Sequence, residues 1–430
     1  MDAKIRKSNL NKLQQNESNV SMTGIRLRYR GDILTKKAYK IPLDYLVYNK
    51  RNGRIGTDVK SFEKQYHVLN PENPKDCKKI EEFLYASKKE RNDITLESLK
   101  QDTQQRYGIV TADGIIIDGN RRAMLLNKIF HERQKRGYRY EEVEHCQYFI
   151  AVILPEDASD KDIEQLETIY QMGEDDKLDY DPIQKYLKCK QLKEHGFTET
   201  DIAHFMSEKP GQIKKWLDIL KLMEEFLEEY NYKDIYTRLG KTEGQFVDLQ
   251  GYIDSYNNRG ANTVSVDWPF TDSDISDLKL VCFDYIRARY EGKEFRDIAK
   301  TGKEGSIFFY KDLWDAFLKE HNNKPEDKYT VDEMRQQFPS EDLSQLLKKR
   351  DNDWVEQAKG FLTGNLQRHT RKLDDKRAAD KPADLIERAL SALRSVDCEQ
   401  TSFYDPAIKE MVSEINSITY DMRKLLKNVH

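Results

Sequence analysis

Apolar residues change their spacing several times along the chain, and the clearest change lies between residues 107 and 154. Asp113-Gly114 is a sequence typical of hairpin turns, and apolar runs flank it on both sides. Three such runs predict strands (Tyr107–Val110, Ile115–Ile117 and Cys146–Leu154), and two further segments predict helices (76–101 and 123–129). Together these elements predict a compact α+β unit over residues 35–157.

Beyond Asp160 the apolar spacing is helical almost to the end of the chain. Asp181-Pro182 predicts the start of a helix, because proline fits the first helical turn. Thr198–Leu222 has the pattern of two helices joined by a turn, and Ile307–Phe309 predicts one short strand. We therefore predict five segments: a basic flexible tail (1–34), an α+β domain (35–157), an all-α helix-turn-helix domain (158–250), a turn-rich linker (251–275) and a helical C-terminal domain (276–430).

The composition narrows the functional classes. The 430 residues include 72 Lys or Arg and 76 Asp or Glu, so the formal net charge is -4 and any nucleic-acid surface must be a local patch. The low content of glycine and proline favours long helices over a turn-rich all-β fold. No apolar run reaches the length of a membrane span, and the five cysteines are scattered without a C-x-x-C pair. We expect a cytoplasmic, nucleoid-associated protein with reduced thiols and no membrane contact.

The strand-turn-helix segment after the hairpin carries the clearest candidate chemistry. Gly119 allows a tight turn, and Asp118 or Asn120 can cap the helix that follows. The first amides of that helix would point outward beside Arg121 and Arg122, which makes an anion site suited to phosphates. A plain capped helix with two solvated arginines fits the same residues, so the pattern alone leaves both interpretations open.

The helix pair over residues 198–222 is the second candidate. Small Ala203 lies where a second helix would cross the first, and Pro210 starts the second helix. The outward face of the second helix offers Lys209, Gln212, Lys214 and Lys215. Lysine contacts phosphates and glutamine can read a base edge, so we predict that this pair binds duplex DNA. Glu208 lies where such turns often bury an apolar residue, and a helical hairpin with a solvated basic face is the alternative.

The order of these features resembles the ParB family of DNA-partition proteins and its wider ParB/sulfiredoxin superfamily, over about residues 35–225. Residues 41–54 (IPLDYLVYNKRNGR) are similar to the family's opening segment, and residues 107–123 (YGIVTADGIIIDGNRRA) to its central strand-turn block. The resemblance implies a ParB/sulfiredoxin-like domain that binds a nucleoside triphosphate, usually CTP, in a DNA clamp that closes on nucleotide binding. By position, Gly108 would lie near the base, and Asp118, Gly119, Asn120, Arg121 and Arg122 would form the phosphate pocket.

The sequence departs from the family in two places. The family's central motif usually reads G-E-R-R, and Asn120 replaces the acid. Its second phosphate motif, an E-N-x-Q-R segment, is replaced by an acidic stretch over residues 172–180. Those carboxylates would repel a triphosphate unless Mg²⁺ lay between them, so Glu174, Asp175, Asp176 and Asp179 are candidate metal ligands. A solvated acidic face is the alternative, and the nucleotide stays open between CTP and ATP.

We therefore predict a nucleotide-responsive, ParB-like DNA-binding protein that acts in partition, regulation, or mobile-element and phage defence. One alternative is a metal-dependent nuclease or NTPase in which Arg121 or Arg122 stabilises a phosphoryl transition state. Another is an adaptor with a vestigial pocket that contacts a protein partner through its C-terminal helices. Near the C-terminus, apolar residues in 4-3-4-3 spacing predict either a homodimer seam or packing onto the chain's own helices: Met411, Ile415, Ile418, Met422 and Leu425.

Overall fold

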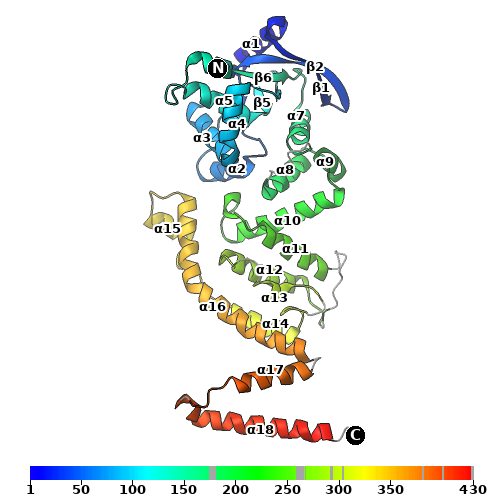
Figure 1. Cartoon of the computed structure of the whole chain (residues 1–430), viewed down its shortest axis with the longest axis vertical. Coiled ribbons are helices and arrows are strands. Elements are labelled where there is room, and N and C mark those ends of the chain that lie inside the picture. Colours follow the sequence, from blue (N-terminus) through cyan, green and yellow to red (C-terminus); the bar gives the residue numbers. More distant parts are fainter. Residues whose placement is uncertain are drawn as a thin grey trace.

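The computed structural model describes residues 1–173, 181–257, 266, 268–290, 294–302, 305–379, 382–399 and 401–427. The molecule is elongated, with a mixed α/β domain at one end and two helices, α17 (Pro382–Arg394) and α18 (Pro406–Lys427), at the other (Figure 1). Among the helices that the structure describes, none is both long and apolar enough to cross a membrane. The coarse prediction of a mixed N-terminal domain followed by helices is confirmed.

A six-stranded mixed sheet forms the centre of the N-terminal domain, in the order β1-β2-β6-β4-β5-β3. Its strands are β1 (Val20–Tyr29), β2 (Asp32–Pro42), β3 (Val47–Tyr48), β4 (Gly108–Val110), β5 (Ile115–Asp118) and β6 (Tyr148–Ile153). β3 pairs with β5 and β4 with β6 in parallel, whereas the other three pairings are antiparallel. The three strands predicted between residues 107 and 154 are all present.

Helices cover both faces of this sheet. They are α1 (Ala3–Gln15), α2 (Gly56–Gln65), α3 (Pro74–Ala86), α4 (Lys89–Asp102), α5 (Asn120–His131), α6 (Tyr140–Val143) and α7 (Asp160–Thr168). On one face, Ile116 and Phe149 lie in an apolar core with α3, α4 and α5. On the other face, Ile117 packs with Leu166 of α7. Because successive strand residues point to opposite faces, this arrangement explains why β5 is apolar without alternation.

The prediction of a flexible tail over residues 1–34 is wrong, because these residues form α1 and the start of the β1-β2 hairpin. Leu10 is fully buried, and Arg6 is only 2% exposed. The Arg6 guanidinium donates a hydrogen bond of 2.9 Å to the carbonyl of Asp113. In β1 the last three apolar residues are buried at alternate positions. The polar composition of this segment concealed a narrow apolar stripe on α1 and another on β1. These stripes are enough to pack a helix and an edge hairpin against the core of the domain.

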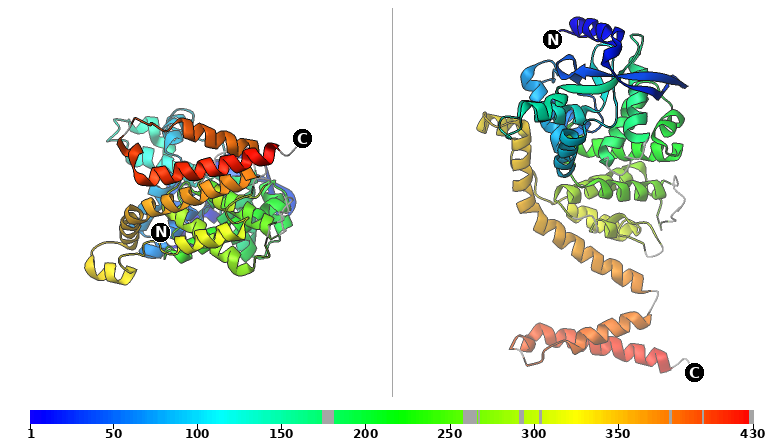
Figure 2. Two further views of the ribbon diagram at one scale, coloured as in Figure 1. Left: turned by 90° about the horizontal axis from the view of Figure 1, so that it is seen from below. Right: turned by 45° about the horizontal axis from the view of Figure 1, so that its top comes forward.

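The remainder of the chain is helical: α8 (Pro182–Glu194), α9 (Glu199–Met206), α10 (Pro210–Glu229), α11 (Glu243–Tyr256), α12 (Asp272–Arg287), α13 (Arg296–Ala299), α14 (Lys311–His321), α15 (Val331–Gln337) and α16 (Leu343–Ala379). α16 runs from beside the N-terminal domain towards α17 and α18 (Figure 2). Its start is tied to the N-terminal domain by a bond of 2.8 Å from the Tyr66 hydroxyl to Asp342.

One apolar core joins α8, α10, α11, α12, α14 and α16, as shown by Phe226, Tyr285 and Trp314. The predicted helix-turn-helix and C-terminal segments therefore share a core, and residues 251–275 do not separate two domains. α11 extends to Tyr256, and α12 begins at Asp272. The composition of residues 251–275 could not reveal that α11 and α12 pack together in one core.

Two local predictions also differ from the structure. The helix predicted over residues 76–101 is two helices, because α3 ends at Ala86 and α4 begins at Lys89. Ile307–Phe309 lies in tight turns instead of a strand, and Ile307 and Phe308 are fully buried. The Ile307 amide donates to the carbonyl of Asp297 at 2.8 Å. A short apolar run fits a buried turn as well as a strand, so the pattern could not decide between them.

Candidate functional site

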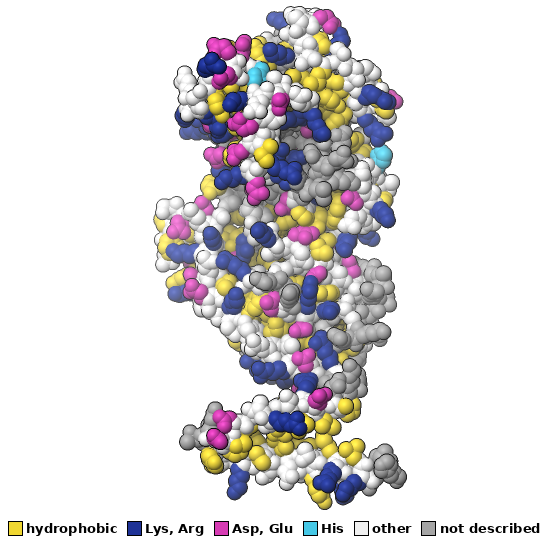
Figure 3. Space-filling view, viewed as in Figure 1, with side chains coloured by type: hydrophobic (Ala, Val, Ile, Leu, Met, Phe, Trp, Pro, Cys, Tyr) yellow, Lys and Arg dark blue, Asp and Glu magenta, His cyan; other side chains and the backbone are white. Residues whose placement is uncertain are grey.

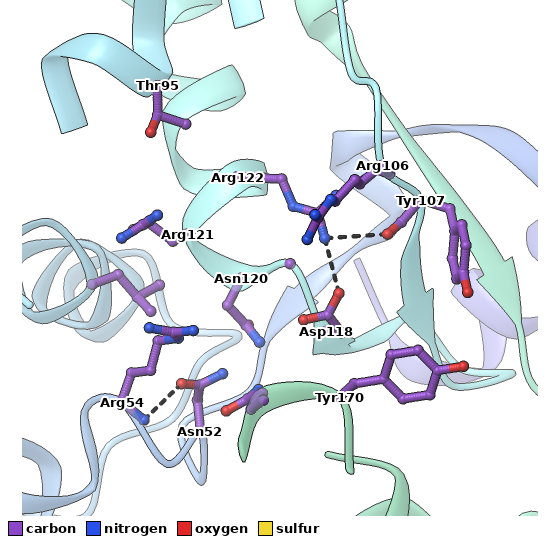
Figure 4. A pocket seen from close by; sticks show the side chains of 13 residues that line it. Asn52, Arg54, Thr95, Arg106, Tyr107, Asp118, Asn120, Arg121, Arg122 and Tyr170 are labelled. Atoms are coloured by element: carbon purple, nitrogen blue, oxygen red, sulfur yellow. Dashed lines mark hydrogen bonds and ion pairs between the residues drawn. The ribbon is translucent and has the colours of Figure 1, made fainter. Parts of the chain in front are cut away.

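A cavity of about 430 Å³ lies beside the N-terminus of α5. Five residues predicted for a phosphate pocket line it: Asp118, Gly119, Asn120, Arg121 and Arg122. Figure 4 shows Arg54 and Arg121 on one side of the cavity, Arg106 and Arg122 on another, and the Tyr107 and Tyr170 rings together at one end. The predicted residues are therefore gathered around one concave site, together with others from distant parts of the chain.

The turn that opens α5 depends on Gly119. Its φ of +96° is a left-handed backbone conformation that favours glycine. A Cβ at this position would also lie 2.6 Å from the Phe149 ring. Gly119 itself is the N-cap of α5, and no side chain makes a capping hydrogen bond there. The prediction that Asp118 or Asn120 caps the helix is therefore wrong, and the positive end of the α5 dipole faces the cavity.

Asn120 has a positioning role in the cavity wall. It is 2% exposed, and its side-chain amide donates a 2.8 Å hydrogen bond to the carbonyl of Ile116. Its side-chain oxygen accepts a 2.8 Å bond from the backbone amide of Asn49. An asparagine can satisfy both bonds because it carries a donor and an acceptor, whereas an ionised carboxylate only accepts. Asn120 thus connects the loop after β3 to β5.

Arginine dominates the charge of the cavity. Arg122 forms an ion pair of 2.8 Å with Asp118 and also donates to the backbone carbonyls of Tyr107 and Arg106. These bonds fix the Arg122 guanidinium in the wall. Arg54 and Arg121 are half-buried, and Arg106 is exposed. Four guanidinium groups thus surround the cavity, and Asp118 is the one carboxylate in the lining that the structure describes.

Gly108 does not line the cavity, so its predicted position beside a nucleotide base is not seen. It is buried in β4, where a Cβ would overlap the Phe149 ring and come within 2.7 Å of the Asp118 carbonyl oxygen. The glycine is thus explained by close packing of β4 on its neighbours. A sequence motif alone does not distinguish a glycine that admits a ligand from one that admits a neighbouring ring.

The loop that carries Asn52 and Arg54 is bonded to α7, which covers the sheet, and to α8, the first helix of the helical part. The Gly53 amide donates to Glu167 of α7 at 3.2 Å, and Gln184 of α8 donates to the Arg54 carbonyl at 2.6 Å. One wall of the cavity is therefore held by the first helix of the helical part. A displacement of this loop would strain both bonds.

Beneath these bonds lies a buried ionic triad of Glu164, Glu167 and Lys188. The Lys188 ammonium lies 2.5 Å from Glu164 and 2.8 Å from Glu167, and all three side chains are less than 5% exposed. Burial would lower the pKa of Lys188, but the two carboxylates outweigh it and raise that pKa. Burial, opposed by Lys188, raises the pKa of Glu167. Lys188 therefore stays charged and joins α7 to α8 inside the protein.

The predicted helix-turn-helix pair consists of α9 and α10. Thr198 and Asp201 form a capping box that starts α9, and Ser207 ends it in a left-handed conformation with φ of +52°. Pro210 stands in the first turn of α10, as predicted. Three helices, α8, α9 and α10, enclose a small apolar core that includes Ile202 and Ile213.

The candidate DNA-binding residues lie together at the start of α10. Lys209, Lys214 and Lys215 are exposed, and Gln212 is half-exposed. Figure 3 shows Lys and Arg side chains gathered where the N-terminal domain meets the helical part. In α16, Arg350 is buried beside Asp351, and Arg368 forms an ion pair with Glu320.

The four predicted metal ligands, Glu174, Asp175, Asp176 and Asp179, lie outside the described residues. Within the described ranges, no group of three or more His, Cys, Asp or Glu side chains is arranged to hold a metal ion. The acidic stretch follows directly on Tyr170 and Gln171, which line the cavity.

Sequence reasoning missed several residues of the cavity: Asn52, Arg54, Arg106, Tyr107, Tyr170 and Gln171. The fold and the cavity define a mixed α/β domain with a cationic pocket, joined to a pair of helices in helix-turn-helix order. Comparison with known protein families, curated proteins and solved structures finds no match for this chain. Its function must therefore be argued from the site.

Proposed function

We propose that this chain is a ParB-like DNA-binding protein whose N-terminal domain binds a nucleoside triphosphate, CTP or ATP, together with Mg²⁺. The observation that carries the proposal is the cavity of about 430 Å³ with four arginines and one carboxylate in its described lining. That volume is within the range of about 300–1,000 Å³ typical of small-molecule sites. The excess of positive charge suits a polyanion.

The chemistry of the cavity supports a phosphate chain next to a planar group. The N-terminus of α5 favours negative charge, and Arg54, Arg106 and Arg121 add fork-shaped donors around it. Tyr107 and Tyr170 supply aromatic rings at the same cavity. Asp118 is already held by Arg122, so Mg²⁺ would be bound mainly through phosphate oxygens and water.

Duplex DNA would be held by α10. The exposed lysines at positions 209, 214 and 215 suit phosphate contacts, and Gln212 suits a base edge in the major groove. The loop bonds from Gly53 to Glu167 and from Gln184 to Arg54 offer a route by which nucleotide binding changes DNA affinity. The biological setting would be partition, regulation or defence.

The nucleotide is tested by calorimetry with CTP, ATP, GTP and UTP in the presence of Mg²⁺. Arg106→Gln should weaken binding of the preferred triphosphate by at least about tenfold, because it removes a charge-assisted contact. Arg28→Gln is the matched control, since Arg28 is an exposed arginine on β1 outside the cavity. If none of the four nucleotides binds, or if both variants bind as wild type does, the nucleotide proposal fails.

DNA binding is tested by measuring duplex affinity against salt concentration. Lys214→Ala combined with Lys215→Ala should lower the slope of log affinity against log salt by about 2, because two phosphate contacts are lost. Lys75→Ala combined with Lys78→Ala removes the same charge from exposed positions on α3 and should leave the slope unchanged. Equal slopes for wild type and the α10 variant would exclude α10 as the DNA-binding helix.

A further inference from the structure

The β1-β2 hairpin carries a concentrated positive charge. Residues 20–42 contain six Lys or Arg and one Asp, which gives a formal charge of +5 in a chain whose net charge is -4. Because the chain as a whole is not basic, a surface of this protein that binds nucleic acid has to be a local patch of this kind. The hairpin contributes nothing to the cavity and is separate from α10, so its charge is not explained by either site.

Two arginines lie on the solvent side of the hairpin. Residues two apart in a strand share a face, so Arg26 and Arg28 point to the same side of β1, while Leu27 between them is buried on the other side. Opposite them on β2 are Thr35 and Ile33, which are also exposed. These four exposed residues form the outer face of the hairpin, and the Cα atoms of the two arginines are about 7 Å apart along β1.

The charges of these two arginines are available to a ligand. Lys37, farther along β2, forms an ion pair of 2.7 Å with Glu17. Arg26 and Arg28, by contrast, have no ion-pair partner among the residues that the structure describes. Both arginines extend from a backbone that is fixed by strand pairing, so less conformational entropy is lost when they bind an anion.

The tip of the hairpin is fixed beside the predicted helix-turn-helix pair. Arg30 at the tip binds Asp157 at 2.7 Å and Asp162 of α7 at 2.9 Å. The neighbouring Lys161 places its ammonium group 4.6 Å from the centre of the Phe197 ring, just before α9 begins. Two consecutive residues of α7 thus contact the hairpin and the segment that leads into α9, and Figures 1 and 2 show the hairpin and α9 on the same side of the molecule.

The spacing between the hairpin and α10 suits a single duplex. α7 is about 10 Å wide, and α9, with eight residues, is about 12 Å long. The start of α10 is therefore closer to the hairpin tip than about 34 Å, the length of one turn of B-DNA. A duplex held by Lys214 and Lys215 can reach the hairpin within one helical turn.

The local structure of the hairpin favours a nucleic acid over other partners. β1 is an edge of the sheet, but its pairing with β2 is irregular between Val20 and Ile25, and Gly24 has a φ of +72°. Such bulges interrupt the continuous edge that an added peptide strand requires. A membrane surface requires a set of apolar side chains, and Ile33 is the one apolar residue of the outer face. Phosphate groups require cationic donors, which the two arginines supply.

We propose that the outer face of the β1-β2 hairpin binds the phosphate backbone of duplex DNA as a second contact, beside the one made by α10. The inference rests on the proposed function, because it takes duplex DNA as the ligand of α10, and it adds a contact from the sheet of the N-terminal domain. Arg26 and Arg28 each pair with a phosphate, so this contact depends on salt concentration and is independent of base sequence.

The affinity for two unrelated duplexes of about 30 base pairs, roughly three helical turns, tests the proposal when it is measured against salt concentration. Arg26→Gln combined with Arg28→Gln should lower the slope of log affinity against log salt by about 2 on both sequences. Arg26→Lys combined with Arg28→Lys keeps the charge and should keep the slope. Arg371→Gln combined with Lys372→Gln removes the same charge from exposed positions on α16 and should leave the slope unchanged.

Combining the hairpin substitutions with Lys214→Ala and Lys215→Ala should lower the slope by about 4, because four phosphate contacts are lost. A wild-type slope in the Arg26 and Arg28 glutamine variant overturns the inference, even if that variant aggregates, because the arginines then only protect an edge strand. If the α10 variant still lowers the slope in that case, the proposed function stands. A slope lowered by the hairpin variant and unchanged by the α10 variant supports the hairpin contact and contradicts the role of α10, and a wild type that binds no duplex contradicts both. Thermal unfolding of each variant checks that the fold is intact.

Discussion

Replacing Lys188 with methionine should destabilise the protein severely. The substitution keeps most of the side-chain volume but leaves Glu164 and Glu167, 4% and 1% exposed, facing each other without their cation. Breaking a buried ionic group by removing one partner costs about 3–5 kcal/mol, and we expect a loss of that size for Lys188→Met at neutral pH. The loss falls on the contact between α7 and α8, which also anchors the cavity loop through Gly53.

The loss should shrink at acid pH. Without Lys188, its charge no longer opposes the burial that raises the pKa of Glu167, so the folded variant binds more protons than its unfolded chain. The destabilisation relative to wild type is then smallest below the unfolded pKa of about 4.3 and grows as the pH rises above it. Adding Glu164→Gln and Glu167→Gln to Lys188→Met gives a triple variant without the buried charges. This variant should recover about 2 kcal/mol or more of the lost stability at pH 7.

Urea unfolding followed by tryptophan fluorescence measures these changes. The Trp216 ring lies beside that of Tyr186 of α8, with ring centroids 5.8 Å apart, so its emission reports on the helix that carries Lys188. A loss below about 1 kcal/mol for Lys188→Met would refute the reasoning, because it would mean that the triad is hydrated or already neutral. A triple variant no more stable than Lys188→Met would refute the assignment of the loss to uncompensated charge.

Three further predictions concern the stability of the fold. Gly119→Ala should lower the free energy of unfolding by about 2 kcal/mol or more, because it combines a left-handed φ with a clash against Phe149. Gly211→Ala, in open space on α10, should leave this free energy unchanged in the same denaturation assay. Leu10→Ala should cost about 2–5 kcal/mol by thermal unfolding, whereas a tail that does not pack would show no effect. Burial opposes ionisation of Asp351, but Arg287, Arg238 and Arg350 outweigh it and lower the pKa of this carboxyl group. The folded state then binds fewer protons than the unfolded chain. The stabilisation from Asp351 is therefore present above about pH 4 and is lost as the pH falls further. Acid titrations of wild type and Asp351→Asn should differ in slope below about pH 4, and parallel curves would contradict this.

The residues of the central segment could be located from the sequence because they are local. Ile115 to Arg122 form a strand, a turn and a helix start through their own spacing, and a glycine between a buried strand and a helix restricts the geometry strongly. The same reasoning placed Pro210 in the first turn of α10. Both of these predictions depended only on neighbours in sequence.

The rest of the cavity could not be predicted, because it is assembled by tertiary contacts. Arg54 and Arg106 come from loops with no distinctive pattern, and they meet only when β3 pairs with β5 and β4 pairs with β6. The burial of Arg6 and Lys188 could not be predicted for a different reason. Both are charged residues that a composition argument assigns to solvent, and each is buried because a specific partner lies opposite it.

α10 belongs to two cores at once, since Ile213 packs with α8 and α9 while Met223 and Phe226 pack in the large helical core. The helix is therefore fixed in rotation at two places along its axis. The direction in which Lys214 and Lys215 point depends on the number of residues between these two packing regions. One residue inserted between them would rotate that face by about 100°, and seven would return it to within about 20° of its original direction. For the proposed DNA-binding function, helical phase would set the angle at which α10 meets a duplex, and only insertions or deletions close to whole turns would keep that angle.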